Sequence, residues 1–268
     1  MTLRLRVSLD DTTMGISGAR FQLVSAGIVR KWGGPDVYEQ GRYLQRLGDK
    51  ACPKIFHVDD VRGCYDMEFL LPHDTHGRET KSDIIADGWD IAHILEEHVW
   101  PRPSVYARAE LQNWREPLAG FLSKLSYQYV ETMKTLYPAS DWWDEAECMI
   151  HGDPTIANMM HRTTGEPVLI DAIAPRGKMP SLREVDLGKV SQSMLGWEEL
   201  LGDRPRGGGL DCFNAWLAQQ TDRGTHWKQK IQFWTGIHCA RILPYAPSNA
   251  VHDWARRYAV RLLDAVRV

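Results

Sequence analysis

The chain has 268 residues, of which 43% are hydrophobic and 25% are charged, and its net charge at pH 7 is -3. This length and composition allow one large domain, or two lobes around a cleft, with a substantial core. The slightly acidic balance argues against a nucleic-acid partner, because such partners are held largely by neutralising their phosphates.

Cysteine usage and hydrophobic patterning indicate the compartment. The cysteines include no Cys-x-x-Cys pair, and their odd number fits poorly with a closed set of disulfides. No apolar run approaches the roughly 18 residues that span a bilayer, and the N-terminal segment is unlike a signal peptide. We therefore expect a cytoplasmic protein with reduced thiols and no membrane partner.

The N-terminal quarter of the chain has the pattern of strands joined by turns. Ser17 and Gly18 lie in a small-residue turn where backbone amides could approach a phosphate, although an ordinary hairpin explains the same residues. Alternating or short apolar runs predict strands at 3–9, 21–24, 26–32, 53–58 and 63–72.

One of these predicted strands carries two adjacent cations. Arg30 and Lys31 are neighbours in the strand 26–32, so their side chains should point to opposite faces of the sheet. A helical pattern follows, with Asp36 at its start and Glu39 in its first turn. A strand lysine with a helix glutamate can form an ion pair, but a solvated lysine and a glutamate that complements the helix dipole explain the pattern equally well.

The rest of the chain has mainly helical spacing. The apolar period changes from strand-like to helical at about Asp87. Helices are predicted at 91–99, 117–136, 213–220, 227–243 and 252–266, with prolines at several of the breaks.

The most informative stretch is 149–160, which reads Met-Ile-His-Gly-Asp-Pro-Thr-Ile-Ala-Asn-Met-Met. Its His-Gly-Asp turn ends on Asp153, Asn158 follows, and the next strand pattern ends on Asp171. Taken singly, each residue could be a loop cap. Together, two carboxylates and a carboxamide suit a divalent metal and a phosphate chain, because magnesium takes oxygen ligands and shares them with phosphates and water.

The order His151-Gly152-Asp153, Asn158 and Ile170-Asp171 resembles the catalytic loop and metal-binding strand of one branch of the protein-kinase-like fold. That branch contains the aminoglycoside phosphotransferases and choline kinases. The run from Asp186 to Ser193 extends the resemblance. Within this branch, the whole run from His151 through Asp171 to Ser193 looks most like bacterial phosphotransferases of capsule and surface-polysaccharide biosynthesis.

The resemblance implies an α+β fold with a small β-rich N-terminal lobe, a larger helical C-terminal lobe, and the active site in the cleft between them. On this reading residues 1–72 form the nucleotide-binding lobe and residues 73–268 the catalytic and acceptor-binding lobe. Asp186 would brace the backbone of the catalytic loop. The basic loop at 175–180 would either be an ordinary solvated loop or lie close to the phosphate and an anionic acceptor.

The resemblance also implies site residues and cofactors. Asp153 would orient and deprotonate an acceptor hydroxyl, and Asn158 and Asp171 would hold magnesium. ATP would be bound by Ser17, Gly18, Lys31, Glu39, Glu68 and Leu70, where Lys31 holds phosphate, Glu39 fixes Lys31, and backbone groups near Glu68 to Leu70 pair with adenine. Arg30 is the competing candidate for the phosphate role.

The expected function is that of an ATP-dependent phosphotransferase, a kinase with an alcohol group as acceptor. It would move the γ-phosphate to a small molecule, a sugar or sugar-derived metabolite. The alternatives are another acceptor, such as an aminoglycoside, amino alcohol, nucleoside or protein side chain, and a catalytically silent nucleotide-binding scaffold. Ala172-Ile173-Ala174 follows Asp171 where protein kinases have Phe-Gly, which disfavours a protein kinase with a regulated activation loop.

Overall fold

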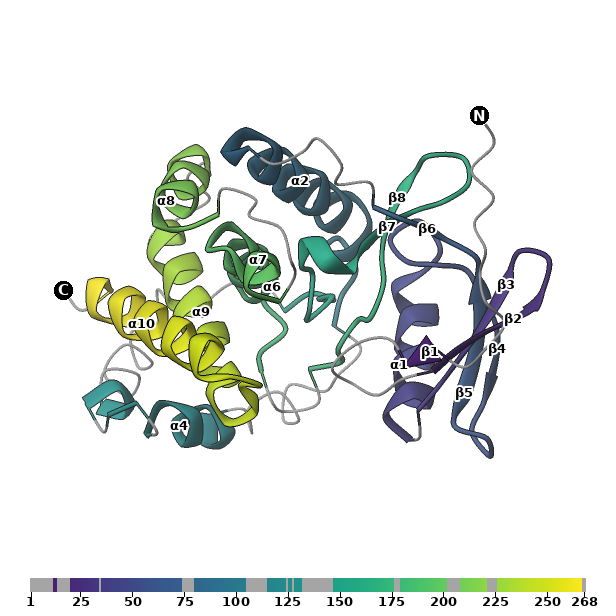
Figure 1. Cartoon of the computed structure of the whole chain (residues 1–268), viewed down its shortest axis with the longest axis horizontal. Helices are drawn as coiled ribbons and strands as arrows, with labels where there is room; N and C mark the ends of the chain where they lie inside the picture. The colour runs from purple at the N-terminus through teal and green to yellow at the C-terminus, as the bar shows by residue number, and fades with distance from the viewer. Residues whose placement is uncertain are drawn as a thin grey trace.

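The structure is a computed structural model that describes residues 12–13, 20–33, 35–73, 80–104, 115–123, 125–126, 128–131, 147–175, 179–201, 208–220 and 226–266. A sheet with one helix forms the N-terminal part, and a larger group of helices forms the rest (Figure 1). The predicted class, a small β-rich lobe with a larger helical lobe, is confirmed. Among the described residues, no helix is both long and apolar enough to cross a membrane.

The N-terminal sheet is antiparallel, and helix α1 (Pro35–Leu47) packs against it (Figure 1). The helix buries Val37, Leu44 and Leu47, whose spacing gives it one apolar side. The strand predicted at 3–9 lies outside the described residues. In the described part the sheet order is β1 (Thr12–Thr13), β2 (Arg20–Ser25), β3 (Ile28–Trp32), β5 (Cys64–Glu68), β4 (Ile55–Asp59).

A second, smaller sheet links the two parts of the molecule. It consists, in the described chain, of β6 (Leu71–Pro72), β7 (Met159–His161) and β8 (Pro167–Leu169). Leu71 pairs with His161, and Met159 pairs with Leu169. Because β7 and β8 are antiparallel, the residues just before β7 and just after β8 meet at one end of the hairpin. Asn158 and Asp171 are therefore brought together.

Two predicted helices have different limits in the structure. Helix α2 (Lys81–Ile94) begins earlier than the apolar period indicated, because Thr80 and Asp83 form a capping box at its start. It continues into the wider turn η1 (Leu95–Val99). The helix predicted at 117–136 is interrupted: α4 (Arg115–Ser123) is followed by non-helical residues at 125–126 and by helical residues at 128–131, and residues 132–136 lie outside the described chain.

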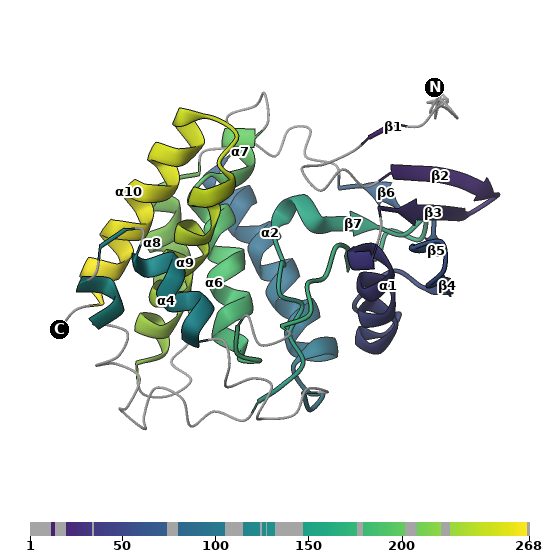
Figure 2. The same ribbon diagram turned by 90° about the horizontal axis from the view of Figure 1, so that it is seen from below.

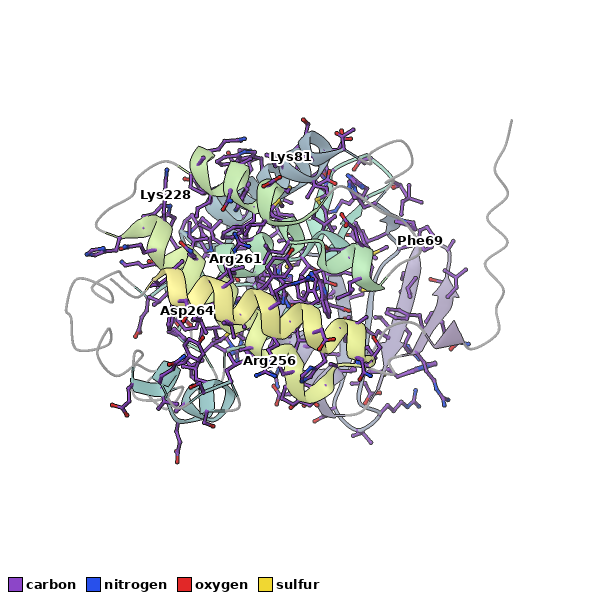
Figure 3. All side chains as sticks on the ribbon, turned by 60° about the vertical axis from the view of Figure 1, so that its left-hand side comes forward. Phe69, Lys81, Lys228, Arg256, Arg261 and Asp264 are labelled. Carbon is purple, nitrogen blue, oxygen red and sulfur yellow. The ribbon has the colours of Figure 1, made fainter. Side chains whose placement is uncertain are left out.

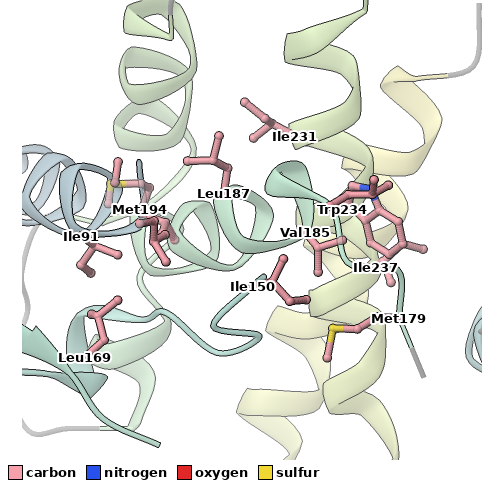
Figure 4. Packing of buried hydrophobic residues seen from close by; sticks show 14 of the residues in the cluster. Ile91, Ile150, Leu169, Met179, Val185, Leu187, Met194, Ile231, Trp234 and Ile237 are labelled. Atoms are coloured by element: carbon pink, nitrogen blue, oxygen red, sulfur yellow. The ribbon is translucent and has the colours of Figure 1, made fainter. Parts of the chain in front are cut away.

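Helices α6 (Arg183–Met194) and α9 (Trp227–Ile242) pack together at the centre of the helical part. A Cβ on Gly188 would lie 2.6 Å from the Cβ of Trp234, so glycine allows this close approach. The buried side chains of the two helices join one hydrophobic cluster (Figure 4). The surrounding helices are α7 (Trp197–Leu201), α8 (Leu210–Gln219) and α10 (Asn249–Ala265), with the turn η4 (Leu243–Tyr245) after α9 (Figure 2).

The outer layer of the helical part is α10. Its apolar residues, including Trp254, are buried against α9, whereas Arg256, Arg261 and Asp264 are exposed (Figure 3). Trp197 packs on Trp254 with ring centroids 5.7 Å apart. Packing against the core therefore accounts for Trp197.

Candidate active site

The loop that contains Asp153 is fixed by a close approach to the segment after Asp171. Gly152 has a φ of +82°, and a Cβ there would lie 2.1 Å from the carbonyl oxygen of Ile173. The Ile173 amide donates to the carbonyl oxygen of His151 at 2.8 Å. Only glycine can meet both requirements at position 152, which explains the middle residue of the His-Gly-Asp turn.

Asp186 braces the backbone of the same loop, as predicted from the resemblance. Its carboxylate accepts hydrogen bonds from the amides of His151 at 2.9 Å and Gly152 at 2.7 Å, and from the Trp100 indole at 3.1 Å. The side chain is fully buried, and this burial raises the pKa of Asp186 to about 7. Asp186 is thus a brace for the loop backbone.

Asp153 is held through both of its carboxylate oxygens. Oδ1 lies 2.9 Å from Nζ of Lys189, and Oδ2 accepts a hydrogen bond from Nδ2 of Asn158 at 2.9 Å. The same Asn158 nitrogen donates to the backbone carbonyl of Asp153 at 2.8 Å. The Asp153 side chain remains 25% exposed, so its carboxylate is oriented and still open to a bound molecule.

Asp171 and Lys31 connect the helical part to the N-terminal sheet. Nζ of Lys31, on β3, forms an ion pair with Oδ1 of Asp171 and donates to Oε1 of Gln40 at 2.8 Å. Asp171 has a φ of 59°, in a region that few non-glycine residues adopt and that is often occupied at functional sites. Lys31 is buried, whereas the Asp171 side chain is 33% exposed.

The residue of α1 that holds Lys31 is Gln40, and the prediction of Glu39 for this role is corrected. The Glu39 side chain is exposed. Gln40 accepts from Lys31, and from the Tyr65 hydroxyl at 3.3 Å, and its Nε2 donates to the Ala172 carbonyl at 3.3 Å. Successive helical residues differ by about 100° in direction, so a change of one position replaces an exposed residue by one that faces the site.

Arg30 occupies the other face of the sheet. It forms a bidentate pair with Asp66, its cross-strand partner on β5, with Nε–Oδ1 and Nη2–Oδ2 distances of 2.5 and 2.7 Å. Hydrogen bonding to Asp66 raises the pKa of Arg30, and Arg30 lowers the pKa of Asp66. Of the two adjacent cations, Lys31 is therefore the one that meets Asp171.

The segment predicted to pair with adenine is anchored at its first residue. Oε1 of Glu68 accepts from Nε of Arg162 at 2.9 Å and from the Lys54 amide at 3.0 Å. The Phe69 amide donates to the Gly27 carbonyl at 2.8 Å, and Leu70 is buried. These contacts fix the backbone of the segment, while adenine pairing there stays a prediction. Ser17 and Gly18 lie outside the described residues.

His151 is a structural member of the loop. It is fully buried, and burial lowers its pKa to about 4. The imidazole is thus neutral at pH 7 and carries no charge that could neutralise a phosphate.

The donor set suits magnesium only when a nucleotide supplies further oxygens. No group of three or more His, Cys, Asp or Glu side chains is placed to hold a metal within the described ranges. Asn158 uses its amide nitrogen on Asp153, which leaves its Oδ1 as a metal ligand, and the partly exposed Asp171 supplies a carboxylate. Two hard oxygens fit an ion that takes its remaining ligands from phosphates and water.

Two residues in the site were not identified from the sequence. Lys189 lies three positions after Asp186 on the same helical side, and so belongs near the loop that Asp186 braces. Gln40 has no signal beyond its neighbour Glu39. A polar residue about one helical turn from a predicted contact is therefore a sequence signal for Lys189 alone.

Comparisons with known proteins place this fold. Models of protein families give no match, and neither do proteins of curated function. Solved structures do match over nearly the whole chain. Choline kinase LicA from Streptococcus pneumoniae has a TM-score of 0.61 and 13% identity, and the match covers 96% of this chain and 94% of that one.

Two further solved structures give similar matches. The aminoglycoside phosphotransferase APH(4)-Ia, in a ternary complex with ADP and hygromycin B, has a TM-score of 0.61 and 10% identity, with coverage of 97% and 94%. A choline/ethanolamine kinase family protein from Mesorhizobium loti has a TM-score of 0.57 and 12% identity, with coverage of 97% and 88%. At these identities the matches establish the fold.

Proposed function

We propose that this chain, which has the protein-kinase-like fold of choline kinases and aminoglycoside phosphotransferases, is an ATP-dependent phosphotransferase. It would move the γ-phosphate to a hydroxyl of a small molecule, a sugar or sugar-derived metabolite. The observation that carries the proposal is the ion pair between Lys31 and Asp171, together with the hydrogen bond between Asn158 and Asp153. We place the lobe boundary near residue 72, where β6 begins to pair with β7.

Asp153 is placed to act on an acceptor hydroxyl. Its carboxylate is oriented by Lys189 and Asn158 before any acceptor binds, which lowers the cost of reaching a reactive geometry. In the proposed reaction the hydroxyl gives its proton to Asp153 as its oxygen bonds to the γ-phosphorus. The bond from that phosphorus to the bridging oxygen breaks, and ADP leaves.

The other residues would hold the nucleotide. Lys31 would exchange its contact with Asp171 for phosphate oxygens, and its bond to Gln40 would keep the ammonium in place. Magnesium, held by Asn158 and Asp171, would neutralise the charge on the phosphates. Adenine would pair with the backbone between Glu68 and Leu70, and the turn with Ser17 and Gly18 would lie near the phosphates.

A silent scaffold is the competing function. It has no chemical need for a hydrogen-bonded Asp153 and Asn158 together with an Asp171 that pairs with Lys31, and these contacts therefore favour an enzyme. The named acceptors of the structural neighbours, choline and an aminoglycoside, are small hydroxylated molecules. The run from His151 through Asp171 to Ser193 supports, by resemblance, an acceptor used in surface-polysaccharide synthesis.

A phosphate-transfer screen tests the proposal. The protein is incubated with magnesium and γ-labelled ATP against sugars, sugar acids, sugar phosphates, amino alcohols, nucleosides and aminoglycosides. The proposal expects label on one acceptor class, and slow release of phosphate to water without acceptor. Tight ATP binding with no transfer to any acceptor or to water would favour the scaffold.

A further inference from the structure

A lysine on the mostly buried helix α6, Lys189, lies beside Asp153. From Glu184 to Met194 every residue of α6 is buried except Lys189, which is partly exposed. Its ammonium reaches Asp153 Oδ1 at 2.9 Å. Between residues 184 and 194 of α6, the partly exposed position therefore carries a cation beside the proposed catalytic base.

A second cation, Arg241, lies on α9, which packs against α6. Gly188, next to Lys189, lets α6 and α9 approach closely at Trp234. One turn further along α9, Nε2 of His238 lies 2.9 Å from the carbonyl oxygen of Val185 on α6. Nδ1 of His238 then lies 3.4 Å from Nη1 of Arg241. His238 therefore connects Arg241 on α9 to the start of α6, the end that carries the loop-bracing Asp186.

Arg241 has only neutral partners in the described part of the chain. Its Nη1 contacts Nδ1 of His238 and, at 3.7 Å, Sδ of Met179, and no carboxylate of the described residues lies within ion-pair distance. Burial lowers the pKa of Arg241, and the charge of Asp153 acts in the opposite direction, so the guanidinium is partly desolvated and electrostatically coupled to Asp153. A desolvated guanidinium with neutral partners gains strongly from a bound anion.

The charge balance around Asp153 selects the class of acceptor. Asp171 is matched by Lys31 and Asp153 by Lys189, which leaves the charge of Arg241 unmatched among the described residues, and burial keeps His238 neutral. An acceptor with an ammonium group would meet two like charges. Tyr245, on η4, is 74% exposed and follows Arg241 by four residues, about one helical turn along the chain.

We propose that the acceptor is an anionic sugar, whose carboxylate or phosphate group is bound by Arg241 and Lys189 while its hydroxyl meets Asp153. Tyr245 offers a ring face to the sugar. This inference rests on the proposed function, and it excludes cationic acceptors such as aminoglycosides and amino alcohols. Arg241 would bind the anion as a fork, and Lys189 would act as a point charge that also positions Asp153.

Four sugars with one common ring test this inference. Binding of D-glucuronate, D-glucose 6-phosphate, D-glucose and D-glucosamine is measured by ligand-observed NMR, with the protein saturated by magnesium and a non-hydrolysable ATP analogue. We expect at least one anionic sugar to bind about tenfold or more tighter than glucose, and glucosamine to bind no better than glucose. The two anionic sugars distinguish a carboxylate from a phosphate.

Substitutions of Arg241 complete the test. Arg241→Gln should bring the anionic sugars to the affinity of glucose, whereas Arg241→Lys should keep part of the preference. Arg256→Gln, which removes an exposed arginine of α10, should keep all of it. Melting temperatures show whether each variant is folded, and Arg241→Lys provides the test if Arg241→Gln is not.

The outcomes separate this inference from the proposed function. Equal binding of the four sugars, absent binding of both anionic sugars, stronger binding of glucosamine, or a preference that survives in folded Arg241→Gln would overturn the anionic acceptor. The nucleotide-analogue affinity is read from the same samples. Nucleotide binding without a preference for anionic sugars would contradict the anionic acceptor and leave the proposed phosphotransferase function standing. Failure to bind the nucleotide would contradict both.

Discussion

Lys31 on β3 and Asp171 after β8 form an ion pair between residues 140 positions apart in the sequence. The pair joins the N-terminal sheet to the helical part at the point where the metal and the phosphates are proposed to lie. Without a nucleotide, each residue neutralises the other. With one, each would have a partner of its own, magnesium for Asp171 and phosphate oxygen for Lys31.

Lys31→Ala should lower ATP turnover far more than Arg30→Ala. Lys31 reaches Asp171, whereas Arg30 pairs with Asp66 on the opposite face of the sheet. Removing Arg30 should cost at most about 1 kcal/mol of stability, because the pair is partly exposed to solvent. Turnover per folded molecule and thermal midpoint are measured on both variants. Greater loss of turnover in Arg30→Ala would give Arg30 the phosphate role.

Gln40 and Glu39 form a matched pair of neighbours for the second prediction. Gln40→Ala removes the acceptor for Lys31 and the donor to the Ala172 carbonyl, and should weaken nucleotide binding roughly tenfold, the effect of losing a hydrogen bond to a charged group. Glu39→Ala changes an exposed residue and should leave the affinity unchanged. Calorimetric titration with magnesium and ATP compares them. The reverse order would restore Glu39 as the partner of Lys31.

Asp186 should make stability fall as pH rises. Burial raises the pKa of its carboxyl from 3.8 to about 7, so between these values the folded chain keeps a proton that the unfolded chain releases. The free energy of unfolding should therefore fall across this window by up to about 1.4 kcal/mol per pH unit from this group. The lowered pKa of His151, about 4, gives the opposite slope between about pH 4 and 6.5.

Chemical denaturation of wild type and Asp186→Asn across this window isolates the contribution. Both proteins contain His151, so its effect cancels in the difference between their unfolding free energies. That difference, wild type minus variant, should decrease as pH rises from about 4 to about 7. A difference that is constant with pH would show that Asp186 is ionised throughout.

The metal site gives the fourth prediction. ATP affinity should depend on magnesium, and Asp171→Ala should abolish the magnesium-dependent part while Asp211→Ala, an exposed aspartate on α8, leaves it intact. Calorimetry with ATP, with and without magnesium, measures both. Equal magnesium dependence in wild type and Asp171→Ala would remove Asp171 from the metal site.

Local patterns in the sequence were sufficient for much of the fold and for the loop. Strand alternation placed Arg30 and Lys31 on opposite faces, and the structure confirms this. The His-Gly-Asp turn needs glycine because the Ile173 carbonyl lies against it, and such a turn can be recognised from its residue types. Asp186 was expected to brace the loop, and it accepts two of the loop amides.

Other features depend on packing that the sequence does not show. Glu39 and Gln40 both suit the first turns of α1, and only the docking of the helix on the sheet decides which of them faces Lys31. Arg241 is connected to α6 through His238 and Val185, a contact between distant segments. The early start of α2 depends on the Thr80 capping box, which comes before the apolar period begins.

Substitution of Asp153 by asparagine tests the central claim most directly. The change is nearly isosteric, so magnesium-ATP affinity and thermal midpoint should stay close to those of the wild type and of Asp253→Asn, an exposed control on α10. Phosphate transfer, or its slow leak to water, should fall on the order of 100-fold or more, the contribution of a positioned general base. A loss of about 1 kcal/mol of stability with turnover per folded molecule preserved would instead make Asp153 a structural cap and contradict the kinase mechanism.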